Sequence, residues 1–170
     1  AAGRRALLRA GLPAVPGRGV ASRSLLCTCV AADDGLGAGE NAGRGGATKN
    51  APVFPWVPFL DPEVAHGGLT EAQAREKHRG VEALTFPMAH VDRARILDRP
   101  AGYIKLVSAR RPLLGRLGGG VLVGAQVVGP HAGELINECA LAIRTRCFAG
   151  RLAQTIHAYP TMSLALQQAE

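Results

Sequence analysis

Few side chains in this sequence could do chemistry together. The candidates are five histidines and four cysteines: His66, His78, His90, His131, His157, Cys27, Cys29, Cys139 and Cys147. Structural zinc sites use cysteine pairs that are separated by about two to four residues and histidine pairs that are separated by about three to five. Cys27 and Cys29 are separated by only one residue, and the histidines show no ligand spacing with one another or with a cysteine. The sequence therefore predicts no metal site.

The two cysteines near the C-terminus do not suit a disulfide either. Cys139 and Cys147 are eight residues apart, which is about 12 Å of rise on a continuous helix. The Cα atoms of a disulfide lie within about 7 Å of each other. We expect both residues to pack as small apolar side chains.

A glycine-rich segment matches the shape of a nucleotide-binding motif. Gly37 to Ala42 reads G-x-G-x-x-A, and residues 25–30 could form the strand that precedes this motif in a dinucleotide-binding fold. The motif works only where it opens a helix whose N-terminus faces a pyrophosphate. Residues 41–52, NAGRGGATKNAP, are too rich in glycine to form that helix. We expect no nucleotide binding here.

The clearest secondary-structure pattern lies closer to the C-terminus. Residues 121–128 are rich in β-branched side chains and too short for a core helix, so they predict a buried strand. Gly129 and Pro130 end it, and a proline is tolerated in a first helical turn. A helix over 133–143 follows, because apolar residues recur at the spacing of one buried face: Leu135, Ile136, Cys139, Ala140 and Ile143. A short helix, a proline-marked turn and a final helix complete this region.

Three further segments predict the rest of a sheet. Residues 102–108 alternate as a half-exposed strand, and a glycine-rich turn leads from them back to the strand at 121–128, which predicts an antiparallel hairpin. Residues 81–86 predict a strand that ends at Pro87. Residues 52–59 predict an edge strand, because three prolines there remove ladder donors.

The connections between these strands are also readable. Asp61 to Glu63 and Gly67–Gly68 predict turns, Thr70 predicts the N-cap of a helix over 71–78, and the charged stretch 90–99 predicts an irregular loop. Together the elements predict an α+β fold, with a mainly antiparallel sheet, helices packed on one face and a disordered N-terminal segment before them.

Composition and charge exclude several classes of function. The net charge is +7, of which +4 falls on residues 1–50. Aromatic residues make up only 4% of the chain, and no basic stripe is interleaved with them, so there is little to build a base-stacking surface. No apolar run is long enough to span a bilayer. We therefore expect no nucleic-acid partner and no membrane association.

The N-terminal segment differs from the rest in composition. Residues 1–32 hold five arginines, two serines, many alanines and leucines, and no acid, which is typical of an organellar transit peptide. Residues 35–46 are too rich in glycine to repay the entropy of ordering. We expect residues 1–45 to be a disordered, transit-peptide-like or linker segment and residues 46–170 to form the folded domain. The location would be a mitochondrion or plastid if the segment is a transit peptide, and otherwise the cytoplasm.

Four segments, in order, resemble one enzyme family. GAQVVGPHAGELINECALAI from Gly124 and TIHAYPTMS from Thr155 are similar to the C-terminal dimerisation domain of the FAD-dependent pyridine nucleotide-disulfide oxidoreductases, which include dihydrolipoamide dehydrogenase, glutathione reductase and mercuric reductase. VPFLDPEVAHGGLTEAQARE from Val57 and GYIKLV from Gly102 agree with this in sequence order. Four ordered matches over three-quarters of the chain are more specific than one short motif. The resemblance implies the same α+β fold and a homodimer.

The resemblance also implies where a reaction would be completed. In these enzymes a histidine just before the proline of the last turn, with a glutamate five residues later, acts as an acid/base pair on the substrate thiol. Matched by position, the histidine is Tyr159 and the glutamate is Leu164. Mercuric reductases carry a tyrosine there, where a phenol can contact a metal ion or act as a weak acid. Tyr159 is thus the candidate catalytic residue, with the alternative that it is only an interface aromatic.

The same turn implies a contact with a cofactor. The backbone of Tyr159 and Pro160 would lie near the flavin of the partner subunit, and the bond between them can be cis in such a turn. His157 stands two residues too early for the acid/base role, so we expect it to be a structural or surface histidine. The paired cysteines that mercuric reductases carry near the C-terminus do not occur in this sequence.

Several parts of a complete enzyme are absent from this sequence: an FAD fingerprint, an NAD(P) fingerprint and a C-x4-C redox pair. Because redox chemistry resides in the cofactors, we expect a fragment of a flavin-dependent NAD(P)H oxidoreductase that acts on a disulfide, a metal ion or a related acceptor. FAD and NAD(P)H would serve the complete enzyme, and the isolated chain would bind neither and be inactive. The alternative is a stand-alone, non-catalytic homodimerising module, which the loss of both catalytic side chains also suits.

Overall fold

The computed structural model describes residues 32, 53–111, 113, 115 and 117–169. The chain divides into two compact units after Phe54, and the fold presented below is that of the unit from Pro55 to Glu170. Apart from residue 32, the predicted disordered segment lies outside the described residues, and so do the Gly37–Ala42 motif and the two N-terminal cysteines.

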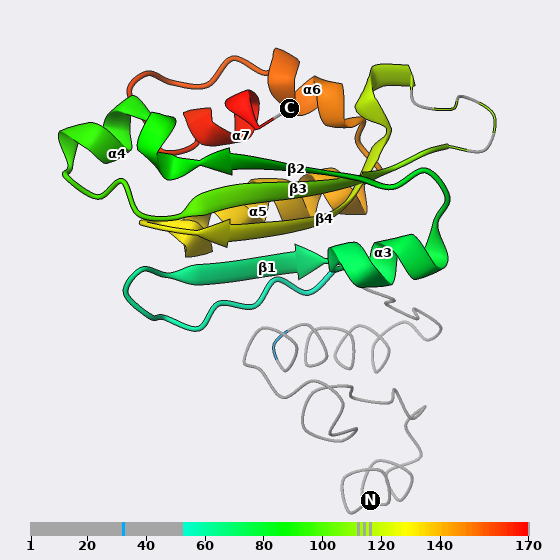
Figure 1. The fold of residues 1–170 in the computed structure, drawn as a ribbon, viewed down its shortest axis with the longest axis horizontal. Coiled ribbons are helices and arrows are strands. Elements are labelled where there is room, and N and C mark those ends of the chain that lie inside the picture. Colours follow the sequence, from blue (N-terminus) through cyan, green and yellow to red (C-terminus); the bar gives the residue numbers. More distant parts are fainter. Residues whose placement is uncertain (1–31, 33–52, 112, 114, 116, 170) are drawn as a thin grey trace, which may run out of the picture. The chain divides into compact units, whose positions relative to one another are not determined.

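A four-stranded antiparallel sheet forms the centre of this unit (Figure 1). Its strands lie in the order β1-β4-β3-β2 and are β1 (Val64–Gly68), β2 (Glu82–Pro87), β3 (Tyr103–Ala109) and β4 (Val121–Val128). β3 and β4 form the predicted hairpin, in which Tyr103 pairs with Val128 and Ala109 with Val121. The β-branched strand predicted at 121–128 therefore occupies an inner position between β1 and β3.

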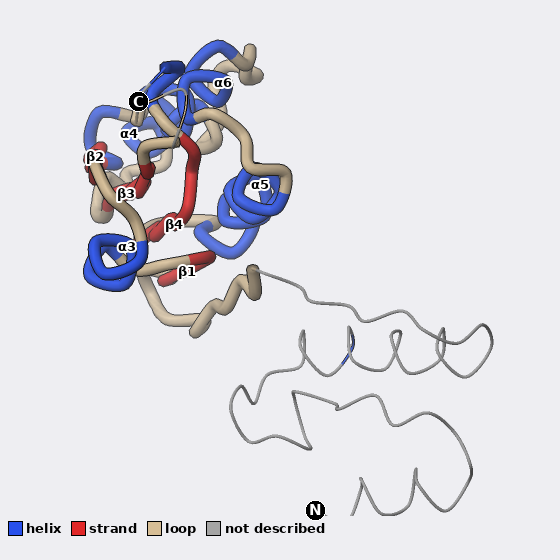
Figure 2. The backbone as a smooth tube through the Cα atoms, turned by 90° about the vertical axis from the view of Figure 1, so that its right-hand side faces the viewer, coloured by secondary structure: helices blue, strands red, loops and turns tan. Residues whose placement is uncertain are grey.

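Helices cover the sheet. The longest is α5 (Ala132–Arg144), which packs along β1 and β4, and shorter helices follow and precede it: α3 (Glu71–Lys77), η1 (Met88–His90), α4 (Asp92–Ile96), η2 (Leu117–Gly119), α6 (Ala149–Gln154) and α7 (Leu164–Gln168). Figure 2 shows α3 on the side of the sheet opposite α5, where Glu71 forms an ion pair with Lys105 of β3. The predicted α+β class is confirmed. No helix in the described part of the chain is long and apolar enough to cross a membrane.

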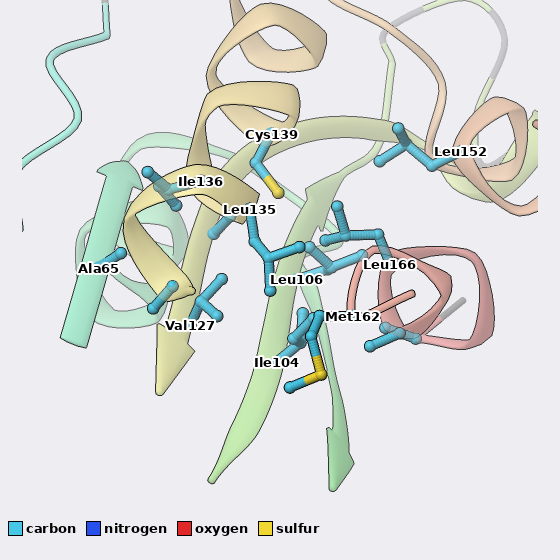
Figure 3. Close-up of a cluster of buried hydrophobic side chains, with 14 of the residues drawn as sticks. Ala65, Ile104, Leu106, Val127, Leu135, Ile136, Cys139, Leu152, Met162 and Leu166 are labelled. Carbon is cyan, nitrogen blue, oxygen red and sulfur yellow. The ribbon is translucent and has the colours of Figure 1, made fainter. Parts of the chain in front are cut away.

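The hydrophobic core lies between the sheet, α5 and the C-terminal helices (Figure 3). Its members include Ala65, Ile104, Leu106, Val127, Leu135, Ile136, Cys139, Leu152, Met162 and Leu166. Cys139 is fully buried among them, which fits the packing role predicted for it. Since Met162 and Leu166 also belong to this core, the segment that precedes α7 is fixed against the sheet.

The first edge strand is shifted from its predicted place. The predicted strand over 52–59 is wrong, because the edge strand is β1. The predicted turn at Gly67–Gly68 is also wrong, because both glycines lie in β1. Trp56 contributes one isolated antiparallel bridge to His66, since the neighbouring prolines have no N–H to donate. At Gly68, where φ is +78°, a Cβ would lie 2.4 Å from the Val123 carbonyl oxygen, so glycine is required there by close approach as well as by conformation.

A second correction concerns residues 90–99, which contain a helix and not only an irregular loop. Val91 and Ala94 lie three residues apart and are both fully buried. This short apolar face holds α4 against the core and outweighs the surrounding charges. The helix predicted from Thr70 is confirmed, because Thr70 and Gln73 form a reciprocal capping box at the start of α3.

Candidate functional site at the C-terminal turn

Residues 155–163, between α6 and α7, form the candidate site and are called the C-terminal turn below. At its start the Thr155 N–H donates to the Leu152 carbonyl at 3.1 Å, and the Thr155 hydroxyl donates to the Arg151 carbonyl at 2.7 Å. At its end Met162 is buried, and its carbonyl accepts the Ala165 N–H at 3.1 Å. Because both ends are anchored, the position of the middle of the turn is defined.

Tyr159 lies on the outside of this turn, with 69% of its surface exposed. The Tyr159–Pro160 peptide bond is cis, as the resemblance allows. The phenol hydroxyl donates a hydrogen bond of 3.0 Å to Oδ2 of Asp92, the first residue of α4. The Asp92 carboxylate raises the pKa of the Tyr159 phenol, mainly through this hydrogen bond and further through its charge. At neutral pH the turn therefore presents a neutral phenol.

His157 points inward. Its side chain is only 6% exposed, whereas the preceding Ile156 is 94% exposed. Its Nε2 lies 3.0 Å from Oε1 of Glu138 on α5, and its Nδ1 lies 2.9 Å from the Thr155 carbonyl oxygen. Both partners are acceptors, and which ring nitrogen donates depends on the tautomer. The contacts tie the C-terminal turn to α5, so of the two roles expected for His157, structural or surface, the structure favours the structural one.

The position of the family glutamate holds an aliphatic side chain. Leu164 begins α7 and is half-buried, and it cannot accept a hydrogen bond from Tyr159. The acceptor comes instead from Asp92, 67 residues earlier in the chain. Asp92 was not predicted as a site residue, because its charged surroundings predicted an irregular loop. Only the folded position of α4 brings it to the turn.

A surface hollow of about 570 Å³ lies beside the C-terminal turn. It is lined by Arg93, His131, Glu134, Leu135, Glu138, Pro160, Thr161, Met162 and Ser163. Charged side chains from α4 and α5 thus face hydroxyl groups of the turn, and the Thr161 and Ser163 hydroxyls are 2.9 Å apart. Among the described residues no group of three histidine, cysteine, aspartate or glutamate side chains could hold a metal ion.

Comparison with known proteins identifies this arrangement. Residues 54–170 match the family described as pyridine nucleotide-disulphide oxidoreductase, dimerisation domain. The chain belongs to this family. The match covers all of the described sheet and its helices, so the resemblance predicted from four sequence segments is confirmed.

The dimerisation domain is also similar to parts of longer enzymes. It is 40% identical over 119 residues to a dihydrolipoyl dehydrogenase of Geobacillus stearothermophilus, an alignment that covers 69% of this chain and 24% of the relative. It is 39% identical over 140 residues to a mercuric reductase of Shigella flexneri, covering 82% of this chain and 24% of the relative. The chain thus spans about a quarter of the length of these relatives.

Solved structures show the same fold. The HOCl-induced flavoprotein disulfide reductase RclA from Escherichia coli superposes with a TM-score of 0.76 at 23% identity, covering 89% of this chain and 34% of that protein. LpdA from Mycobacterium tuberculosis superposes with a TM-score of 0.71 at 24% identity, covering 86% and 30%. At this level of identity the likeness concerns the fold alone.

Proposed function

We propose that this domain joins two copies of a flavin-dependent NAD(P)H oxidoreductase and completes the active site of the partner subunit. The observation that supports this most is the exposed Tyr159 on a turn anchored at both ends. FAD and NAD(P)H would supply the hydride and electron transfer of the complete enzyme. An exposed aromatic turn fits a contact with a flavin held by another chain, through the backbone of Tyr159 and Pro160.

The isolated chain is expected to hold no cofactor, since its own contribution to the flavin site would be this one turn. A visible absorption spectrum of the purified chain after incubation with FAD and gel filtration tests this. We expect no flavin to remain with the protein. A stoichiometric yellow flavin would contradict the proposal.

The acceptor of the complete enzyme would be a disulfide, a metal ion or a related group. A dithiol enzyme of this family relies on an imidazole oriented by a carboxylate, whereas this turn carries the phenol of Tyr159 and the aliphatic Leu164. A neutral phenol is a poor base near neutral pH. This combination supports a metal ion or another electron acceptor over a dithiol.

The homodimer would form through the outer side of α5 and the C-terminal turn. Leu141 of α5 is 64% exposed, and Ile156 of the turn is almost fully exposed. Apolar side chains in such positions lose contact with water when a second subunit covers them. Burial of these two side chains in the partner would also bring Tyr159 to the other subunit.

Sedimentation velocity of the chain over a range of concentrations tests the homodimer. Leu141→Asp and Ile156→Asp should each shift the chain toward monomer, because a carboxylate would be buried without a partner. Leu113→Asp is the matched control, since Leu113 is 98% exposed in the connection between β3 and β4. A chain that is monomeric at every concentration would refute the homodimer, and an equal effect of the control would refute this choice of surface.

The alternative function is a stand-alone homodimerising module without catalysis. It is favoured by the absence of both family catalytic side chains at Tyr159 and Leu164. Sequencing of the transcript upstream of the codon for Ala1 separates the two proposals. An open frame that encodes two dinucleotide-binding domains would eliminate the module, and an in-frame stop followed by a start codon would favour it.

The location in an organelle is also a proposal, supported by the arginine-rich and acid-poor composition of residues 1–32. Fusion of residues 1–45 to a fluorescent protein tests it. Import into mitochondria or plastids is the expected result, and a diffuse cytoplasmic signal would contradict it.

A further inference from the structure

We propose that Asp92 is the positioning residue of Tyr159: from α4, its carboxylate fixes the phenol that the C-terminal turn presents to the partner subunit. This inference rests on the proposed function, because that function is what gives an exposed Tyr159 a task. It assigns to Asp92 the orienting work that neither the turn nor position 164 can do, since residues 155–163 contain no carboxylate and position 164 holds leucine.

Asp92 lies at the start of a helix that is packed against the core. Its neighbours Val91 and Ala94 are fully buried members of the core. The Val91 N–H donates to the Met88 carbonyl at 2.9 Å, and Nε of Arg95 donates to the Ala89 carbonyl at 2.7 Å. These contacts tie α4 to the preceding η1. The backbone of Asp92 is therefore held in place by the core and by η1.

The orientation of the Tyr159 ring depends on its contact with Asp92. An exposed side chain on a turn samples several rotamers unless a directional contact selects one, and the selection costs rotamer entropy. The contact that selects one here is the hydrogen bond from the phenol hydroxyl to Oδ2 of Asp92 at 3.0 Å. The bond uses the single proton of the hydroxyl and leaves the lone pairs of the phenol oxygen available as acceptors.

The second polar pair of the turn cannot do this work. His157 and Glu138 also join the turn to a helix, but the His157 side chain is almost fully buried. Its contact fixes the backbone of the turn and offers little surface to another molecule. Tyr159 with Asp92 is the pair that remains exposed, so it is the one that a partner subunit could meet.

A nuclear magnetic resonance titration of the full 170-residue chain tests the proposal. The chain has two tyrosines, Tyr103 and Tyr159, so carbon-13 labelling of the tyrosine Cζ gives two signals, which Tyr159→Phe assigns. Asp92→Asn keeps the size of the side chain and removes its charge. We expect this variant to move the ionisation midpoint of Tyr159 to lower pH and to leave Tyr103 unchanged. The ring signals of Tyr159 should also sharpen as the ring gains mobility.

Two further variants complete the test. Asp92→Glu retains a carboxylate and should restore part of the higher midpoint. Asp98→Asn is the matched control, because Asp98 lies just beyond α4 with φ of +53°, a conformation that asparagine adopts readily. The control should leave both tyrosine signals as in the native chain.

The outcomes separate this proposal from the proposed function. The positioning role would be overturned, even if the chain is a dimer, by either of two results. One is an ionisation midpoint of Tyr159 that does not change in a folded Asp92→Asn variant, and the other is a Tyr103 signal that shifts as much as the Tyr159 signal. A chain that stays monomeric in sedimentation but keeps the Asp92-dependent midpoint would overturn the homodimer and retain the contact. If circular dichroism shows that Asp92→Asn is unfolded, the native chain is compared with Asp92→Glu instead. If the ring mobility and the ionisation midpoint of Tyr159 are unchanged in Asp92→Glu, despite its longer side chain, the positioning contact is also contradicted.

Discussion

The carboxylate of Glu63 accepts a hydrogen bond from the backbone N–H of Gly133, with 3.0 Å between Oε2 and N, across 70 residues of sequence. The N-cap of α5 is His131, which makes no side-chain capping bond. Glu63 therefore supplies the acceptor that the first turn of α5 lacks, and its charge suits the helix N-terminus. Its backbone carbonyl also accepts the Gly129 N–H at 2.9 Å. One residue thus fixes both the end of β4 and the start of α5.

Replacement of Glu63 by alanine should destabilise the domain. The expected loss of a helix cap lowers the free energy of unfolding by about 0.5–2 kcal/mol. Urea unfolding measures this loss. The chain concentration is kept fixed, because self-association would change the apparent stability. Glu76→Ala is the control, since Glu76 is exposed on α3, and it should change the free energy of unfolding by no more than about 0.5 kcal/mol. Equal effects of the two substitutions would show that the Glu63 contact contributes nothing.

Two glycines of the same region should respond in opposite ways to alanine. At Gly124 of β4 a Cβ would lie 1.9 Å from the Leu69 carbonyl oxygen, so the backbone would have to move. At Gly133 the nearest atom would be Cγ1 of Val57 at 3.5 Å, an ordinary contact. Gly124→Ala should cost about 1–3 kcal/mol or more, whereas Gly133→Ala should be neutral or stabilise by up to about 1 kcal/mol. Thermal unfolding of both variants measures this, and similar melting temperatures would contradict the close approach at Gly124.

The elements that the sequence predicts well are those with a strong local pattern. The β-branched run gives β4, and the apolar spacing that follows it gives α5, because each pattern places its apolar side chains on a buried face in only one type of secondary structure. β1 was missed because Gly67 and Gly68 are typical of a turn. At Gly68 a glycine is required by the close approach of the Val123 carbonyl, which is a property of the tertiary structure that no local pattern shows.

The candidate site was predictable in part. Tyr159 follows from its position in a turn that resembles the family motif, and its exposure agrees with that. Asp92 could not be found in this way, because its partner lies 67 residues away and no local pattern marks it. The same holds for Glu138, whose contact with His157 joins two elements that are separate in sequence.

The far face of the sheet gives a pH prediction. The pKa of Glu71 is lowered from its ordinary value of 4.5, first by the hydrogen bond from Lys105 and then by that from Arg75. Because the pKa is lower in the folded state, the stability from this carboxylate is present above about pH 4.5 and is lost as the pH falls through the folded-state value. The free energy of unfolding of the native chain should therefore exceed that of Glu71→Gln at neutral pH, and the difference should shrink in acid. Glu76→Gln, at an exposed position on the same helix, is the control for the substitution itself.

The contact between His157 and Glu138 should stabilise the C-terminal turn. The His157 side chain is almost fully buried and the Glu138 side chain is about one-third exposed, so removing either partner leaves the other as a poorly solvated polar group. Each single alanine variant should lose about 1–3 kcal/mol of stability.

A double-mutant cycle isolates the contact from the packing of each side chain. His157→Ala combined with Glu138→Ala should lose less than the sum of the two single variants, with a coupling energy of about 0.5–3 kcal/mol. His78→Ala provides the control, because His78 is exposed at the C-cap of α3 and should neither destabilise the chain nor couple to Glu138. Strict additivity of His157→Ala and Glu138→Ala would mean that the two side chains do not interact in solution, and the position of the turn would then rest on its other contacts, among them the burial of Met162 and the hydrogen bond from Tyr159 to Asp92.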